Sequence, residues 1–384
     1  MTEPIRILQV LTIMNRGGAE TMIMNYYRNI DRSRVQFDFM LHREERGVFD
    51  DEIEALGGKI YRMPKIRLHQ LSPYLKSLDN FFSKHPEYKI VHSHINALSV
   101  FVLRAARKHK VPVRIAHSHT SLYSLNLNPF SKDRHSLKFA ARFAVQNVMK
   151  SGITRNANHY FSCGGKAGVW LYGKRNIDKV QLLNNAIDTD VFVYDADKSQ
   201  LMKERLNVSE KLVVGHVGNF VPEKNHGFIL NTYMALRKLR ENTALVLVGA
   251  YAKKELQRLV DYDLPEDVHV LGLRNDVPDV LQAMDVFLFP STNEGLPLTL
   301  IEAQASGLVI KASANITREM VMTVLMEFIS LNETPEFWAK RILDSFPYQR
   351  ENTKDQIVKG SYDIENNVKS LQQFYIDELE KINE

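Results

Sequence analysis

The chain has little cysteine, little net charge and no long hydrophobic run. Cys163 is the only cysteine in 384 residues, which excludes an internal disulfide framework and fits a reducing compartment. No stretch reaches the roughly 20 apolar residues that a membrane-spanning helix needs. The first residues, which include Glu3 and Pro4, lead into a predicted strand and do not read as a signal peptide. We therefore expect a cytoplasmic protein.

The excess of basic residues is small. A net charge of +5, spread along the chain without interleaved aromatic residues, argues against a nucleic-acid partner. It fits acidic ligands or an anionic membrane surface. A hydrophobic share of 44% over 384 residues suits more than one domain with a core of its own.

Strand patterns and helix patterns alternate along the chain, without internal repeats. This predicts an α/β protein with two doubly wound, Rossmann-like domains. We place them at residues 1–190 and 191–362, because the pattern breaks between 188 and 197, and expect an amphipathic helix at about 363–384. The predicted strands begin near 5, 37, 59, 89, 113, 159 and 180 in the first half, and near 212, 244, 268 and 286 in the second.

The segment 294–307, EGLPLTLIEAQASG, is the most informative motif. It follows an apolar strand and opens a helix that Gly307 ends, with Glu294 and Glu302 on either side of the helix start. Carboxylates accept hydrogen bonds from hydroxyl groups, and free backbone N–H groups at a helix start bind phosphate. The pattern favours a nucleotide-activated sugar as ligand, whereas the alternative is a capped helix with solvated glutamates. The N–H groups expected to face a ligand belong to Gly295, Leu296, Leu298 and Thr299.

Two further turns follow predicted strands. Gly218 and Asn219 precede Lys224, whose ammonium group could neutralise a diphosphate or could be an ordinary surface charge. Gly17 and Gly18 let the backbone approach a ligand closely, or simply form a tight turn. Neither turn has the G-x-G-x-x-G spacing of a dinucleotide site.

Histidine pairs end two neighbouring predicted strands. His92 and His94 close one strand, and His117 and His119 close the next. Alternation puts each pair on one side of its strand, at the carboxyl end where α/β sheets bind ligands. Imidazole is a common zinc ligand, but no convincing carboxylate or cysteine partners accompany these histidines, and we expect no metal.

Together these segments resemble the retaining glycosyltransferases of the GT-B fold that build bacterial capsule, lipopolysaccharide and exopolysaccharide. The resemblance covers nearly the whole chain. It implies Rossmann-like domains that face each other across a cleft, a C-terminal helix that packs back onto the first domain, and catalysis without a metal or other cofactor.

The resemblance also implies roles for individual residues. Glu302 would accept the ribose hydroxyls, Lys224 would balance the diphosphate, and His117 would touch the donor sugar. The family usually has arginine where this chain has Asn219, and Gly249 alone remains of a Gly-x-Gly-Pro turn near the base. The implied donor-binding residues are Gly17, Gly18, Asn219, Lys224, Gly249, Glu294, Gly295, Leu296, Pro297, Leu298 and Glu302, and the implied catalytic residues are Glu294, His117 and Lys224.

The implied reaction moves a hexose or N-acetylhexosamine, with retention, from a nucleotide-sugar to a lipid-linked or saccharide acceptor. The donor is expected to be UDP-linked. The alternatives are a UDP-sugar epimerase of the same fold, or a sugar-nucleotide-binding protein whose turnover is weakened by Asn219.

A basic amphipathic stretch at 132–150 gives a further expectation. Its lysines and arginines could rest on anionic lipid, and the loop 121–131 could receive a lipid-linked acceptor. We favour the other interpretation, a helix whose face of Leu137, Ala141, Ala144 and Val148 packs on the sheet while its charges lie in water.

Overall fold

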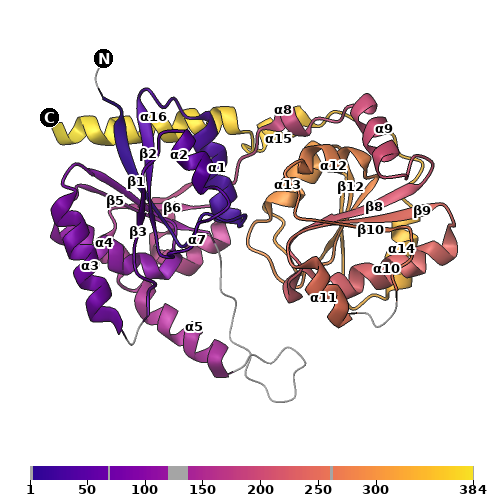
Figure 1. Cartoon of the computed structure of the whole chain (residues 1–384), viewed down its shortest axis with the longest axis horizontal. Helices are drawn as coiled ribbons and strands as arrows, with labels where there is room; N and C mark the ends of the chain where they lie inside the picture. The colour runs from indigo at the N-terminus through magenta and orange to yellow at the C-terminus, as the bar shows by residue number, and fades with distance from the viewer. Residues whose placement is uncertain (1–2, 68–69, 120–136, 260–262, 384) are drawn as a thin grey trace. The chain divides into compact units, whose positions relative to one another are not determined.

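The computed structural model describes residues 3–67, 70–119, 137–259 and 263–383 (Figure 1). It divides into two compact units, the first comprising Met1–Ala186 with Ile364–Glu384 and the second comprising Ile187–Asp363. Each unit contains one parallel sheet with helices on its faces. The predicted pair of doubly wound α/β domains is therefore confirmed.

The sheet of the first unit has seven parallel strands in the order β3-β2-β1-β4-β5-β6-β7. The strand order reverses between β1 and β4, and such reversals are where open α/β sheets bind ligands. Its strands are β1 Ile5–Leu11, β2 Val35–Leu41, β3 Ile60–Arg62, β4 Ile90–Ser93, β5 Val113–Ser118, β6 His159–Ser162 and β7 Val180–Leu182.

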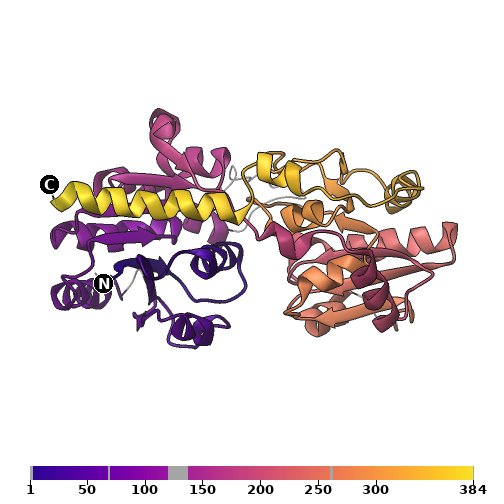
Figure 2. The ribbon, with the colours of Figure 1, turned by 90° about the horizontal axis from the view of Figure 1, so that it is seen from above.

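Helices cover both faces of this sheet. The C-terminal helix α16, Ile364–Asn383, lies along the sheet of the first unit (Figure 2). Its Tyr375 is fully buried and packs edge-on against Phe37 of β2. The other helices are α1 Gly18–Asn29, α2 Asp50–Ala55, α3 Leu71–Lys84, α4 Ser99–Lys108, α5 Leu137–Lys150, α6 Ile153–Asn156 and α7 Gly165–Tyr172, with short 3-10 turns η2 Asn96–Leu98 and η3 Lys174–Lys179.

The sheet of the second unit has six parallel strands in the order β10-β9-β8-β11-β12-β13, and its order reverses between β8 and β11. Trp338 of α14 is fully buried in the core beneath β8, β9 and β11. The strands are β8 Leu212–Val217, β9 Thr243–Val248, β10 Val268–Gly272, β11 Val286–Phe289, β12 Val309–Ser313 and β13 Met326–Ile329. The helices are α8 Thr189–Phe192, α9 Ala196–Arg205, η4 Pro222–Lys224, α10 His226–Leu239, α11 Ala252–Leu259, α12 Val277–Ala283, α13 Leu298–Ala305, α14 Pro335–Leu343 and α15 Lys354–Lys359.

The basic stretch is seen only in part. Residues 120–136, which carry much of the predicted acceptor loop and the first basic residues, lie outside the described residues. In the last turns of α5, Ala144 is exposed and Val148 is 74% exposed. The expectation that this apolar face packs on the sheet is wrong at these positions, because periodicity reveals an apolar face but not what covers it.

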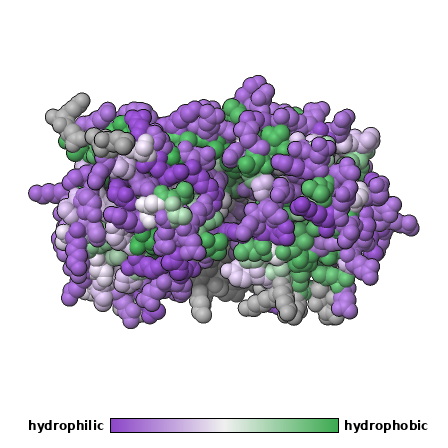
Figure 3. Space-filling model, turned by 45° about the horizontal axis from the view of Figure 1, so that its top comes forward, coloured by the Kyte–Doolittle hydropathy of each residue, from purple (hydrophilic) through white to green (hydrophobic). Residues whose placement is uncertain are grey.

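The face of the molecule seen in Figure 3 is largely polar. Hydrophilic residues cover most of the face seen in Figure 3, with smaller hydrophobic patches between them. Across the described ranges, every helix is too short or too polar to cross a membrane.

Candidate active site

The reversal point of the second sheet brings together the loops after β8 and β11. Asn225 adopts a left-handed conformation between η4 and α10, and its side chain donates to the carbonyl of Pro290 at 3.2 Å. The backbone N–H of Thr292 donates to the carbonyl of Glu223 at 2.9 Å. These bonds hold the loop after β8 against the loop after β11, so that segments distant in sequence form one site.

Lys224 and Glu294 meet at this point. Their Nζ and Oε1 atoms form an ion pair at 2.7 Å, and both side chains are largely buried. The Lys224 ammonium also lies 4.7 Å from the ring centre of Phe289, at the end of β11, which adds a cation–π contact. The structure therefore joins two of the predicted catalytic residues through a charge pair.

Gly218 and Gly249 allow the ends of β8 and β9 to approach closely. A Cβ atom on Gly249 would overlap the carbonyl oxygen of Gly218, and one on Gly218 would lie 2.8 Å from Nε2 of His216. Asn219, which stands where the family usually has arginine, accepts a hydrogen bond from the N–H of Ala250 at 3.1 Å. Its carboxamide ties the loop after β8 to the loop after β9, a structural use that the sequence did not suggest.

The loop from Glu294 through Gly295 and Leu296 leads to Pro297, which caps α13. The first backbone N–H groups of α13, on Leu298 and Thr299, have no acceptor within the described parts of the chain. Such groups at a helix start form an anion-binding position. The hydroxyl of Thr299 is also buried without a partner there.

Glu302 lies on the second turn of α13. Its side chain is partly accessible, yet burial raises its pKa to about 7. Within the described ranges, its carboxylate has no hydrogen-bond or ion-pair partner. A carboxylate in this state can accept hydrogen bonds from a ligand that carries hydroxyl groups.

Sequence reasoning missed a second polar group beneath the loop after β8. His216 is fully buried in β8, donates from Nδ1 to the carbonyl of Leu288, and leaves Nε2 unpartnered among the described residues. Burial is the main reason that its pKa lies well below the ordinary value, and the charge of Lys224 contributes. A histidine inside the apolar run 212–217 was the signal that could have found it.

The turn before α1 in the first unit holds Gly17 and Gly18. A Cβ atom on Gly17 would overlap the carboxylate of Glu20, whereas one on Gly18 would meet nothing within 4 Å. The overlap at Gly17 involves only the end of a flexible side chain, so neither position requires glycine on steric grounds. Burial raises the pKa of Glu20 to about 7.

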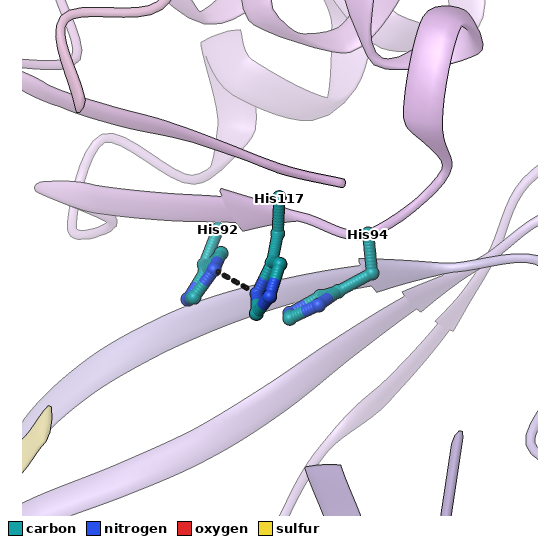
Figure 4. Close-up of side chains that lie close together, drawn as sticks. All are labelled: His92, His94 and His117. Carbon is teal, nitrogen blue, oxygen red and sulfur yellow. Dashed lines mark hydrogen bonds between the residues drawn. The ribbon is translucent and has the colours of Figure 1, made fainter. Parts of the chain in front are cut away.

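The predicted histidine pairs form one cluster at the carboxyl ends of β4 and β5. The rings of His92, His94 and His117 lie side by side (Figure 4), and His92 Nε2 is 3.2 Å from His117 Nδ1. His119 stacks on His117 with ring centres 4.0 Å apart. The cluster extends to Gln9 of β1 and Tyr375 of α16, which sequence reasoning did not select.

The cluster also offers nitrogen atoms to a cation. One ring nitrogen from each of His92, His94 and His117 lies within 4.8 Å of the others. The planes of the His92 and His117 rings differ by only 14°. An imidazole lone pair lies in the plane of its ring, and His92 Nε2 and His117 Nδ1 face each other at hydrogen-bond distance, 3.2 Å. The geometry favours hydrogen bonding within the cluster.

Each of the two units matches a known protein family. The family of "Glycosyl transferase 4-like domain" proteins matches residues 17–163, and the family "Glycosyl transferases group 1" matches residues 211–345. EpsF of Bacillus subtilis strain 168, which carries a provisional glycosyltransferase name, is 34% identical over 98% of this chain and 97% of its own. The UDP-Gal:alpha-D-GlcNAc-diphosphoundecaprenol alpha-1,3-galactosyltransferase of Escherichia coli is 27% identical over 89% of each chain.

A solved structure shows the same fold. HepE of Anabaena, crystallised with UDP, superposes with a TM-score of 0.73 and 17% identity, covering 97% of this chain and all of its own. The two parallel sheets, the loops at their reversal points and the full-length match to EpsF lead to one conclusion. The chain belongs to the group 1 glycosyltransferases of the GT-B fold.

Proposed function

We propose that this glycosyltransferase moves a hexose or N-acetylhexosamine, with retention, from a UDP-sugar to a lipid-linked or saccharide acceptor in exopolysaccharide or capsule biosynthesis. No metal or other cofactor takes part. The observation that carries the proposal is the Lys224–Glu294 ion pair at 2.7 Å, set beside the open start of α13 and the unpartnered carboxylate of Glu302.

The ion pair supplies a way to exchange partners when the donor binds. The diphosphate would take the place of Glu294 beside the Lys224 ammonium, because two phosphate groups carry more negative charge than one carboxylate. Glu294, released from the lysine, would accept hydrogen bonds from the sugar hydroxyls. Glu302 would accept from the ribose hydroxyls and anchor the other end of the donor.

The same groups serve the chemical step. When the bond between the anomeric carbon and the phosphate oxygen breaks, its electron pair stays on the UDP oxygen. Lys224 and the N–H groups of Leu298 and Thr299 would stabilise that negative charge. The acceptor hydroxyl would attack from the same face and pass its proton to the departing phosphate oxygen, which retains the anomeric configuration.

The relatives support the donor and acceptor classes. The name of the Escherichia coli relative states a UDP-Gal donor and a diphosphoundecaprenol-linked acceptor, and HepE was crystallised with UDP. A lipid-linked acceptor would place the reaction at the cytoplasmic face of a membrane. The exposed Val148 on α5 supports peripheral contact with that membrane. Co-sedimentation of the wild type and of a Val148→Asp variant with anionic and with neutral vesicles would test this contact.

A binding screen tests the donor site. Calorimetry with a panel of sugar nucleotides is expected to find one UDP-sugar that binds the wild type. The control variant is Glu210→Ala, because Glu210 is an exposed residue before β8, and it should bind the same UDP-sugar. The Glu302→Ala variant should bind it at least tenfold more weakly. Equal binding by all three proteins would show that Glu302 does not contribute to donor binding.

A product assay separates transfer from its alternatives. With the bound donor and an acceptor panel, we expect a glycosylated acceptor of retained configuration. An epimerised sugar nucleotide formed without acceptor would identify an epimerase. Donor binding with neither transfer nor hydrolysis would identify a binding protein that has lost turnover.

A further inference from the structure

His216 of β8 lies beneath the turn that precedes Lys224. Its side chain is fully buried, and its Nδ1 donates to the carbonyl of Leu288 at 2.9 Å. Burial holds the pKa of His216 well below the ordinary value, so the ring is neutral at neutral pH. A neutral imidazole has one N–H group, and in His216 this group is on Nδ1. Nε2 is therefore a bare acceptor, and it has no hydrogen-bond partner among the described residues.

The side chain of Lys224 lies beside this acceptor. A Cβ atom placed on Gly218 would lie 2.8 Å from Nε2 of His216 and 3.3 Å from both Cδ and Cε of Lys224. Outside the turn 217–219, these are the three heavy atoms closest to that point. The bare nitrogen and the end of the lysine side chain thus border the same space, which no side chain of residue 218 fills. The charge of Lys224 also contributes to the low pKa of His216, in agreement with this proximity.

The ammonium group of Lys224 can use a further acceptor. It has three N–H donors, of which Glu294 takes one through Oε1 at 2.7 Å. The ring of Phe289, 4.7 Å away, offers only its π face. The lysine side chain is just 17% exposed, so water has limited access to the remaining N–H groups. A buried donor gains stability from each acceptor that it reaches.

The rings on this side of Lys224 carry no charge. His226, the first residue of α10, meets His216 edge-on with ring centres 5.0 Å apart, and it stacks on Phe220 at 3.8 Å. Burial, with a contribution from Lys224, lowers the pKa of His226 to about 4. A carboxylate at either position would compete with a diphosphate for the ammonium group. A neutral ring nitrogen accepts a hydrogen bond and leaves the full positive charge of the lysine to the ligand.

We propose that His216 is a positioning residue for the diphosphate: when the ligand takes the place of Glu294, one N–H of Lys224 turns to Nε2 of His216. The lysine then has two arrangements, paired with Glu294 in the free protein and held between His216 and the phosphates in the complex. The second arrangement gives the buried nitrogen a partner, which favours binding because an unpartnered buried acceptor is costly. The inference rests on the proposed function for the diphosphate, but the bare Nε2 is a property of the ligand-free protein.

Nitrogen-15 spectra of the histidine-labelled full chain measure the state of His216 directly, because a bare ring nitrogen and a protonated one give separate signals. Without ligand, we expect a proton on Nδ1 and a bare Nε2. Saturating UDP should move the Nε2 signal toward that of a hydrogen-bonded nitrogen in the wild type but not in Lys224→Met. A charged ring or a proton on Nε2 in the free protein would overturn the inference, whether or not UDP binds.

A double-mutant cycle tests the link between the two side chains. His216→Phe keeps a ring beside Phe287 and Phe289, which His216 stacks on, but it has no acceptor. In calorimetry this variant should bind UDP about tenfold more weakly and uridine as the wild type does. In the Lys224→Met background the same change should alter UDP binding less than about twofold, because the partner is already gone. An equal loss in both backgrounds would mean that His216 acts on the fold and not through Lys224, and would overturn the proposal.

His269→Phe is the matched control. His269 belongs to β10 of the same sheet, and its Nε2 is also buried without a partner among the described residues. This variant should bind UDP like the wild type, and a loss equal to that of His216→Phe would contradict a specific role for His216. UDP binding with an unchanged Nε2 signal would overturn the role of His216 alone, whereas a wild type that binds no UDP compound would overturn the proposed function.

Discussion

Replacing Glu302 by glutamine should make the ligand-free protein more stable and the site inactive. Glutamine has nearly the same shape as glutamate but cannot ionise. Burial raises the pKa of Glu302 from 4.5 to about 7, which means that the folded protein disfavours the charged carboxylate. The glutamine variant is free of that cost.

The size and the pH range follow from the pKa shift. A rise from 4.5 to about 7 corresponds to an upper limit of about 3.4 kcal/mol, at 1.36 kcal/mol for each unit. Because the side chain is partly accessible, we expect about 1–3 kcal/mol. In the wild type this cost is absent below pH 4.5, grows as the pH rises toward 7, and is complete above 7. Glu302→Gln should therefore stabilise the protein at pH 8 and have little effect at pH 4.5.

Thermal unfolding of the full chain at both pH values measures the effect. The exposed Glu210→Gln serves as control and should match the wild type at each pH. The same Glu302→Gln protein should bind the UDP-sugar at least tenfold more weakly at pH 8. The reasoning would be refuted if Glu302→Gln were no more stable than the wild type at pH 8, or equally stabilised at both pH values. Either result would mean that burial does not disfavour the ionised carboxylate of Glu302.

Other perturbations have equally definite outcomes. Affinity of the wild type for the UDP-sugar should fall up to about tenfold for each pH unit below 7 as Glu302 becomes protonated, and a flat profile from pH 5.5 to 8 in calorimetry would contradict this. Lys224→Met should weaken UDP binding about tenfold or more but leave uridine binding nearly unchanged, and equal losses for both would contradict a diphosphate role. Gly249→Ala should destabilise the protein by more than 2 kcal/mol and reduce donor binding, whereas Gly272→Ala, where a Cβ meets nothing within 4 Å, should cost only about 1 kcal/mol in thermal unfolding. Arg350→Ala should cost about 3 kcal/mol, because its guanidinium donates to the carbonyls of Ser306, Gln282 and Met284, and Arg350→Lys should not restore the loss.

The fold was within reach of sequence reasoning because its signals are local and repeated. Apolar runs such as 286–289 and 244–248 are buried parallel strands, and helix patterns separate them. The turn residues at strand ends also identify where each sheet can bind a ligand. That local evidence placed Lys224 and Glu294 at the same edge of one sheet, and the structure joins them in an ion pair.

The contacts that sequence reasoning missed depend on distant packing. Gln9 looks like an ordinary member of an apolar strand, and Tyr375 like one apolar position of an amphipathic helix. They are 366 positions apart and meet only once α16 packs on the sheet. The wrong expectation for Val148 has the same origin, since a helical pattern does not contain the identity of its neighbour. Long-range partners need the tertiary structure.

The most direct measurement is a crystal structure of the protein with the UDP-sugar that it binds. We expect the ribose hydroxyls within hydrogen-bond distance of Glu302, the diphosphate beside Lys224 and the start of α13, and Glu294 turned from the lysine to the sugar. A ligand bound away from these residues, with the Lys224–Glu294 pair intact, would contradict the account.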